Sequence, residues 1–140
     1  MMRGIPINTS GVNDQLLLPK ASLVEWGAIF QNVFINAFNA MLDSDRKLIE
    51  VSSRIGGRNF EILVQDTGCG VDLKEAESLF EPFVRKVKIS PERQALGYGG
   101  MGLGLTIVRM IAHNVLCEVS FVEPQKGFST AFSLRWRESG

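Results

Sequence analysis

Two asparagines four residues apart are the side chains of this sequence best placed to bind a ligand. Asn32 and Asn36 lie in the otherwise apolar stretch 26–38, and their spacing puts both amides on one face of a helix. A buried amide without a hydrogen-bond partner costs ~1–3 kcal/mol, so a ligand could be that partner. The amide oxygen of Asn36 could bind Mg²⁺, which also keeps waters and phosphates as ligands. The alternative is a helix asparagine satisfied by backbone or water.

A glycine-rich segment later in the chain could bind phosphate. Five glycines within residues 97–104 let the backbone approach a ligand closely, and they lead directly into a predicted helix. The first turn of a helix offers unpaired N–H groups and the positive end of the helix dipole. The alternative is a flexible loop before an ordinary helix start. No Gly-Lys-Ser/Thr follows and no βαβ unit surrounds the glycines, which excludes the Walker and Rossmann types of site.

Asp66 ends a predicted strand and is followed by Gly68 and Gly70. Its carboxylate could accept hydrogen bonds from an exocyclic amine while a flat ring lies against the bare glycine backbone. The alternative is a turn aspartate that binds its own backbone. Both interpretations remain open from these residues alone.

The elements that must position these residues follow from patterning. Ser22 and Glu25 form a predicted capping box that starts a helix running to about Leu42. Period-two alternation predicts a hairpin around Gly56-Gly57. The pattern as a whole predicts an α+β fold, a two-layer α/β sandwich with a mixed, mostly antiparallel sheet and helices on one face. The other predicted elements are strands 48–55, 59–65, 118–122 and 128–136, and helices 72–80 and 103–114; residues 84–100 form a long loop.

Composition restricts the class of protein. The chain has 140 residues, enough for one domain, and 15 basic residues balance 15 acidic ones. This balance gives no electrostatic case for nucleic-acid or membrane contact. No apolar run reaches the ~18–20 residues that span a bilayer. The cysteines, Cys69 and Cys117, lack metal-site spacing and favour a reducing, cytoplasmic compartment, although one disulfide stays possible.

The order of these motifs resembles one arrangement, the Bergerat-fold ATPase superfamily, over about residues 16–136. The resemblance is closest to the catalytic, ATP-binding domain of sensor histidine kinases. Residues 32–37 resemble the N box, 66–70 the G1 box, 79–83 the F box and 100–105 the G2 box, while 84–100 would be the ATP lid. Residues 127–132 resemble the glycine-threonine strand that closes the family's fold.

The resemblance implies roles for individual residues. Asp66 would contact the adenine amino group, Asn36 would hold Mg²⁺, and Asn32 and Arg85 would act in catalysis. Many superfamily members that hydrolyse ATP, and the anti-sigma serine kinases, have Glu where this chain has Asn32. Glu can act as a general base and Asn cannot, which favours transfer to a nucleophile supplied by a partner. The implied ATP-binding residues are Asn32, Asn36, Asn39, Asp66, Gly68, Gly70, Phe83, Gly100, Met101, Gly102, Leu103, Gly104, Leu105 and Thr130.

The resemblance also implies that ATP binding and the phosphate-accepting histidine lie on separate domains. Residues 1–140 would form a single catalytic domain, by itself a monomer, without a dimerisation or phosphoacceptor domain; the one histidine, His113, is expected near a helix end. The γ-phosphate of ATP would pass to a histidine on a separate helical dimerisation domain of the same kinase, and then indirectly to a response regulator. The parent kinase could be membrane-anchored. The alternative functions are a water-hydrolysing ATPase of this superfamily or an anti-sigma-type serine kinase.

Three positions depart from the family pattern. Asn39 stands where many members have Lys or Arg. Asn114-Val115 replaces the Gly-Gly expected after the last helix, and Asn114 is expected to take the left-handed cap conformation. Ser129 replaces a common glycine.

Overall fold

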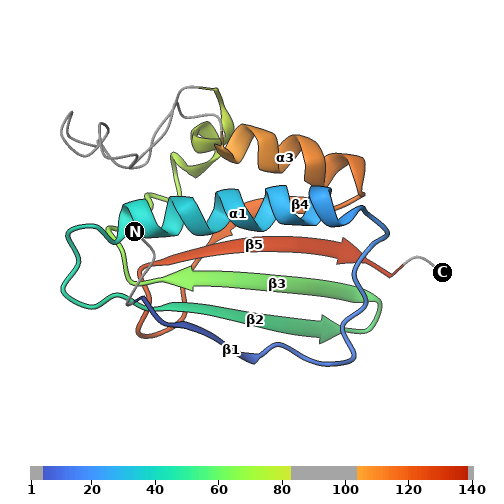
Figure 1. Cartoon of the computed structure of the whole chain (residues 1–140), viewed down its shortest axis with the longest axis horizontal. Coiled ribbons are helices and arrows are strands. Elements are labelled where there is room, and N and C mark those ends of the chain that lie inside the picture. Colours follow the sequence, from blue (N-terminus) through green and yellow to red (C-terminus); the bar gives the residue numbers. More distant parts are fainter. Residues whose placement is uncertain (1–4, 83–103, 139–140) are drawn as a thin grey trace.

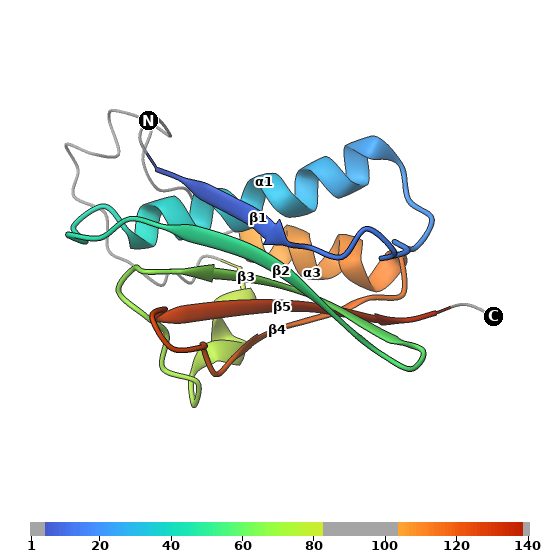
Figure 2. The same cartoon turned by 90° about the horizontal axis from the view of Figure 1, so that it is seen from below.

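A computed structural model describes residues 5–82 and 104–138. The predicted α+β two-layer sandwich is confirmed: a five-stranded sheet of order β1-β2-β3-β5-β4 carries two α-helices on one face (Figures 1 and 2). Among the strands of these described residues, only the β1–β2 pair is parallel. The elements are β1 Ile7–Gly11, α1 Leu23–Ala40, β2 Ile49–Gly56, β3 Asn59–Asp66, the 3₁₀ helix η1 Ala76–Phe80, α3 Gly104–Asn114, β4 Glu118–Val122 and β5 Thr130–Arg137.

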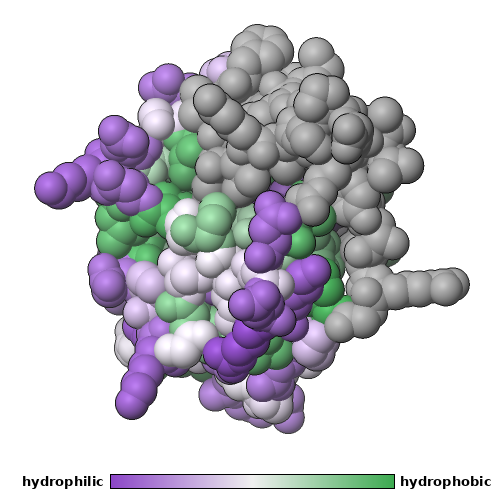
Figure 3. Space-filling model, turned by 90° about the vertical axis from the view of Figure 1, so that its left-hand side faces the viewer, coloured by the Kyte–Doolittle hydropathy of each residue, from purple (hydrophilic) through white to green (hydrophobic). Residues whose placement is uncertain are grey.

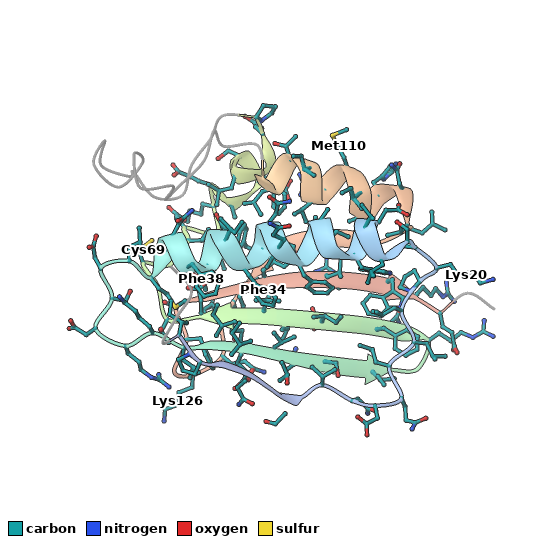
Figure 4. The ribbon with its side chains drawn as sticks, viewed as in Figure 1. Lys20, Phe34, Phe38, Cys69, Met110 and Lys126 are labelled. Carbon is teal, nitrogen blue, oxygen red and sulfur yellow. The ribbon has the colours of Figure 1, made fainter. Side chains whose placement is uncertain are left out.

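Helix α1 lies over one face of the sheet (Figure 1). The predicted capping box starts it: Glu25 N donates to Ser22 Oγ at 3.1 Å, and Ser22 N donates to Glu25 Oε1 at 3.0 Å. The helix ends at Ala40, two residues before the predicted end. Phe34 and Phe38 point from α1 toward the sheet (Figure 4), and Phe38 is buried in the core. The buried residues of this apolar stretch, Ile29, Val33, Ala37 and Phe38, form the core-facing side of the helix.

The strands of the predicted hairpin are confirmed, with a small shift of the turn. Gly56 pairs with Asn59, so Gly57 and Arg58 are the two central turn residues rather than Gly56 and Gly57. Gly57 has a φ of +64°, a conformation that suits glycine at the first central position of a tight hairpin turn. The hairpin leads into β3, which delivers Asp66 to its carboxyl end.

The predicted helix over 72–80 is wrong in length and type. Asp72 Oδ1 accepts a hydrogen bond from Lys74 N, and Asp72 O accepts one from Glu75 N. These bonds close a turn before the chain becomes helical, so only a 3₁₀ helix of 5 residues remains. The predicted strand over 128–136 begins later, at Thr130, because Phe128 N donates to Gln125 O in a turn.

The outer face of the sheet, away from the helices, carries alternating charges. Arg54 lies opposite Glu61, Glu61 opposite Arg135, and Arg135 opposite Glu118. The Arg54–Glu61 and Arg135–Glu118 pairs each have an N···O separation of 3.7 Å. Ser133, on the same face, donates from Oγ to Glu61 Oε2 at 2.6 Å. This row of cross-strand pairs leaves the outer face locally balanced in charge.

Both cysteines are free thiols, Cys69 exposed and Cys117 buried, so the disulfide alternative is excluded. Burial raises the pKa of Cys117 to about 11, which keeps this thiol protonated at neutral pH. Within residues 5–82 and 104–138, no helix combines the length and apolar content that a bilayer crossing requires.

The turn after α3 differs from the expected one in the residue that takes the left-handed conformation. The left-handed residue is Leu116, with a φ of 62°, and not Asn114, which still belongs to the helix. Cys117 N donates to Ala112 O at 2.8 Å and Leu116 N donates to His113 O at 3.1 Å, the hydrogen-bond pattern of a Schellman motif. Glycine is favoured at the left-handed position of this motif, whereas Leu116 carries a side chain that is 86% exposed.

We predict that Leu116→Gly stabilises the domain. Removing Cβ relieves a left-handed conformation that costs roughly 1–2 kcal/mol. The greater conformational entropy of glycine in the unfolded chain lowers the free energy of unfolding by ~0.4–1 kcal/mol. The expected gain in free energy of unfolding is about 0.5–1 kcal/mol, measured by urea denaturation. Leu116→Ala is the control, since it removes the apolar side chain and keeps Cβ. Equal stability of the two variants would contradict the prediction.

Candidate functional site

The candidate site centres on Asp66 and Thr130, where β3 ends and β5 begins. The two residues are paired across the strands, and each is only 3% exposed. They lie at the left-hand end of the sheet in Figure 1, next to the end of α1. Within the described residues, Thr130 Oγ1 is the buried side-chain oxygen that has no hydrogen-bond partner. Because an unpaired buried hydroxyl is unfavourable, this atom marks a place where a ligand or water can bind.

Asp66 holds the turn that follows it, called here the G1 turn (residues 66–70). Its Oδ1 accepts a hydrogen bond from Gly68 N at 2.8 Å, and its backbone oxygen accepts one from Ser129 N at 2.9 Å. The interpretation of Asp66 as a turn aspartate is therefore confirmed for Oδ1. A contact with an exocyclic amine stays a prediction that this bond does not exclude, because each carboxylate oxygen can accept more than one hydrogen bond.

Gly68 is needed because α1 lies against it. A Cβ on Gly68 would come within 2.7 Å of Ala40 O and 2.8 Å of Ala40 C, a separation that real contacts do not show. Cys69 N donates to the same Ala40 O at 3.1 Å. Gly70 has a φ of +82°, which also favours glycine. The bare backbone of Gly68 thus faces the helix on this side, where the sequence had suggested a ligand ring.

Thr67 attaches the G1 turn to the α1–β2 loop. Its Oγ1 donates to Arg46 O at 2.6 Å and accepts from Leu48 N at 3.1 Å. Arg46 in turn donates from Nη1 to Gly127 O at 2.9 Å. Three segments that are distant in sequence, the G1 turn, the α1–β2 loop and the loop before β5, are therefore joined next to Asp66. Thr67 was not predicted from the sequence, because a threonine between two motif positions carries no local signal for contacts of this range.

Asn32 is partly satisfied within the protein. Its Nδ2 donates to Ala28 O at 2.7 Å, and its Oδ1 lies 3.0 Å from where a Cβ of Gly104 would be. The amide therefore packs against the first described residue of α3, and Gly104 makes room for it. Its own helix thus supplies an acceptor for one of the two amide N–H groups, so that hydrogen does not depend on a ligand.

The other predicted residues of the helices lie on both sides of the site. Asn36 and Asn39 are half-buried on α1, on the part of the helix that approaches the G1 turn. The Leu105 side chain is buried in the hydrophobic core, so a ligand could reach only its backbone. The following predictions lie outside the described residues: Phe83, Arg85, Gly100, Met101, Gly102, Leu103 and the lid over 84–100.

Arg109 joins η1 to α3. Its Nη1 pairs with Glu77 Oε2 at 2.8 Å, and its guanidinium carbon lies 3.9 Å from the centre of the Phe80 ring. The hydrogen bond from Arg109 lowers the pKa of Glu77. Thr106 Oγ1 donates to Phe80 O at 2.8 Å. These contacts hold together the elements that precede and follow residues 83–103, and no local sequence pattern predicts them.

The end of the molecule that carries the site mixes hydrophilic side chains with apolar ones (Figure 3). Within the described residues, no group of three or more His, Cys, Asp or Glu side chains could hold a metal ion. A Mg²⁺ held by one protein oxygen and by phosphates needs no such group, and the half-buried Asn36 amide fits that pattern.

Residues 24–139 match the family model "Histidine kinase-, DNA gyrase B-, and HSP90-like ATPase". The chain belongs to this ATPase family. Curated relatives include the sensor protein TorS of Escherichia coli, 36% identical over 98 residues, which are 69% of this chain and 10% of that protein. Another is the autoinducer 2 sensor kinase/phosphatase LuxQ of Vibrio vulnificus, 46% identical over 59 residues, which are 42% of this chain and 6% of that protein. The chain thus spans a small fraction of the length of these relatives.

Solved structures of histidine kinases share the fold. The mycobacterial sensor histidine kinase MprB superposes with a TM-score of 0.68 at 19% identity, covering 95% of this chain and 81% of that one. The catalytic domain of histidine kinase ThkA gives 0.68 at 19% identity, over 97% of this chain and 80% of that one. At this level of identity the likeness establishes the architecture.

We predict that Gly68→Ala destabilises the domain by ~2 kcal/mol or more, because the new methyl group would push the G1 turn away from Ala40. Thermal unfolding would measure the loss. Gly56→Ala is the matched control, since a Cβ there meets no atom within 4 Å. A Gly68→Ala variant as stable as this control would show that α1 and the G1 turn can separate without cost.

Proposed function

We propose that this chain is the ATP-binding catalytic domain of a sensor histidine kinase. It would bind Mg-ATP and transfer the γ-phosphate to a histidine on a separate helical dimerisation domain. The observation that carries the proposal is the unpaired, buried Thr130 hydroxyl opposite the buried Asp66, in a chain of this ATPase family. A buried carboxylate beside a buried hydroxyl can match the donor and acceptor edge of adenine.

The base and the phosphates would bind at opposite ends of the site. Asp66 would accept from the adenine amine, and Thr130 would supply the hydrogen bond that its hydroxyl now lacks. Asn36 would hold Mg²⁺ through its amide oxygen, with Asn32 and Asn39 beside it on α1 facing the phosphates. Gly104 and the glycines before it would offer N–H groups at the start of α3, and Mg²⁺ would neutralise phosphate charge when bound. Arg85 and Phe83 complete the proposed set.

The position of Asn32 supports transfer to a protein over hydrolysis. Its amide donates to Ala28 O and cannot take a proton from water at neutral pH. A neutral histidine imidazole already has a lone pair, so the acceptor needs no general base from this domain. Catalysis would then consist of positioning and of charge neutralisation. Curated relatives named as sensor kinases support the same choice.

The proposed partners follow from this activity. The acceptor histidine lies on the dimerisation domain of the same kinase, and a response regulator receives the phosphate from there. The domain itself, residues 1–140, would be a cytoplasmic monomer that contacts neither nucleic acid nor membrane, although its parent kinase could be membrane-anchored.

We predict that Thr130→Val weakens ADP binding without destabilising the free protein. Valine has nearly the shape of threonine and removes a hydroxyl that is unpaired in the described structure, so the free energy of unfolding should stay equal or rise by up to ~1 kcal/mol. ADP affinity, measured by calorimetry with Mg²⁺, should fall roughly 3- to 10-fold. Thr130→Ser keeps the hydroxyl and should bind as wild type does. Unchanged affinity of the valine variant would place adenine elsewhere.

The activity itself is tested with the full-length parent protein and ATP labelled at the γ-phosphate. We expect acid-labile, base-stable label on a histidine of the parent, lost in an Asp66→Ala variant. Acid-stable phosphoserine on a partner would indicate the anti-sigma type. Rapid multiple-turnover release of phosphate by this domain alone would indicate the hydrolase alternative.

A further inference from the structure

The side chain of Ser129 contacts the G1 turn directly. Its Oγ lies 2.6 Å from Gly68 O and 3.2 Å from Asp66 O, and its backbone N donates to Asp66 O at 2.9 Å. A hydroxyl has a single proton, so the shorter contact, to Gly68 O, is the main hydrogen bond. We propose that Ser129 is a positioning residue that orients Asp66 for recognition of adenine, an inference that rests on the proposed function.

The hydrogen bond from Ser129 holds the second of the two peptide units that flank Gly68 in the G1 turn. Gly68 O accepts from Ser129 Oγ, while Gly68 N donates to Asp66 Oδ1 at 2.8 Å. The glycine that orients the carboxylate is therefore held at both its N–H and its C=O. Loss of the hydroxyl would leave the Gly68 carbonyl without this donor, while Cys69 N of the same peptide unit stays bonded to Ala40 O. The peptide could then tilt about this remaining contact and loosen the bond from Gly68 N that sets the direction of the carboxylate.

The loop that contains Ser129 does not depend on this hydroxyl for its attachment. Gln65 and Gln125 form two reciprocal hydrogen bonds of 2.8 Å, and Arg46 donates to Gly127 O at 2.9 Å. The backbone bond from Ser129 N to Asp66 O is also independent of the side chain. Removal of the hydroxyl should therefore act on the G1 turn more than on the loop or on the register of β5.

Serine at this position distinguishes the chain from the pattern that its sequence resembles, in which glycine is common. Glycine has no side chain to bind the Gly68 carbonyl. Thr130, the next residue, carries the unpaired hydroxyl, so the change lies directly beside the proposed adenine contact. Ser129 would thus sharpen the discrimination between adenine and bases that lack its exocyclic amine.

The test compares ADP with inosine diphosphate, whose base has an oxo group in place of that amine. Affinities for both, measured by calorimetry with Mg²⁺, give a ratio that reports base recognition. We expect Ser129→Ala to weaken ADP binding roughly 3- to 10-fold, the contribution of one hydrogen bond, and inosine diphosphate binding less than 2-fold. Ser129→Gly lacks the same hydroxyl and should reproduce the fall in the ratio, which excludes an effect of the alanine methyl group.

Ser133→Ala is the matched control. It removes a hydrogen bond of the same length, 2.6 Å, from the same part of the chain, but on the outer face of the sheet. We expect this variant to keep the wild-type ratio even if its melting temperature falls. An unchanged affinity ratio in Ser129→Ala, whether both nucleotides bind equally more weakly or both bind as they do to the wild type, would overturn the role of Ser129 while leaving the proposed function intact. Absence of ADP binding by the wild-type domain would instead overturn the proposed function, and this inference with it.

Discussion

The close approach of the G1 turn to the end of α1 is the constraint on which the site depends. Gly68 lies against Ala40, and Cys69 N satisfies the Ala40 carbonyl, one of the last acceptors of the helix. This contact joins the sheet layer to the helix layer at one end of the molecule. As a result the buried pair of Asp66 and Thr130 lies beside the helix that carries the asparagines, although these residues come from distant parts of the chain.

Contacts made by α3 extend the same organisation to the other side of the site. The start of α3 packs on Asn32, and Arg109 and Thr106 hold η1 through Phe80. The packing of Gly104 against the Asn32 amide depends on a close steric fit. The Arg109–Glu77 ion pair is 38% and 75% exposed at its two side chains and contributes little on its own. The ring and backbone contacts of Phe80 therefore do most to fix η1 on α3.

Local signals predicted the elements well, and contacts between distant residues explain what was missed. Both partners of the α1 capping box lie within four residues, and period-two patterning identified the β2–β3 hairpin. In contrast, the position of Leu116 depends on how a helix end meets β4, and the 3₁₀ form of η1 depends on a turn that Asp72 closes. Asp66 and Gly68 were identified, but the reason for Gly68 is a helix 28 residues earlier in the chain. The contacts of Thr67 and Ser129 join segments that no local pattern connects.

The alternating charges on the outer face of the sheet bear on how a partner can approach. Neighbouring opposite charges cancel over a few ångströms, and salt screens what remains beyond about 8 Å. The row from Arg54 to Glu118 therefore projects almost no field into solution. A charged protein that approaches this row therefore gains little long-range electrostatic steering from it. Electrostatic steering of an acidic or basic partner would then have to come from charges outside this row.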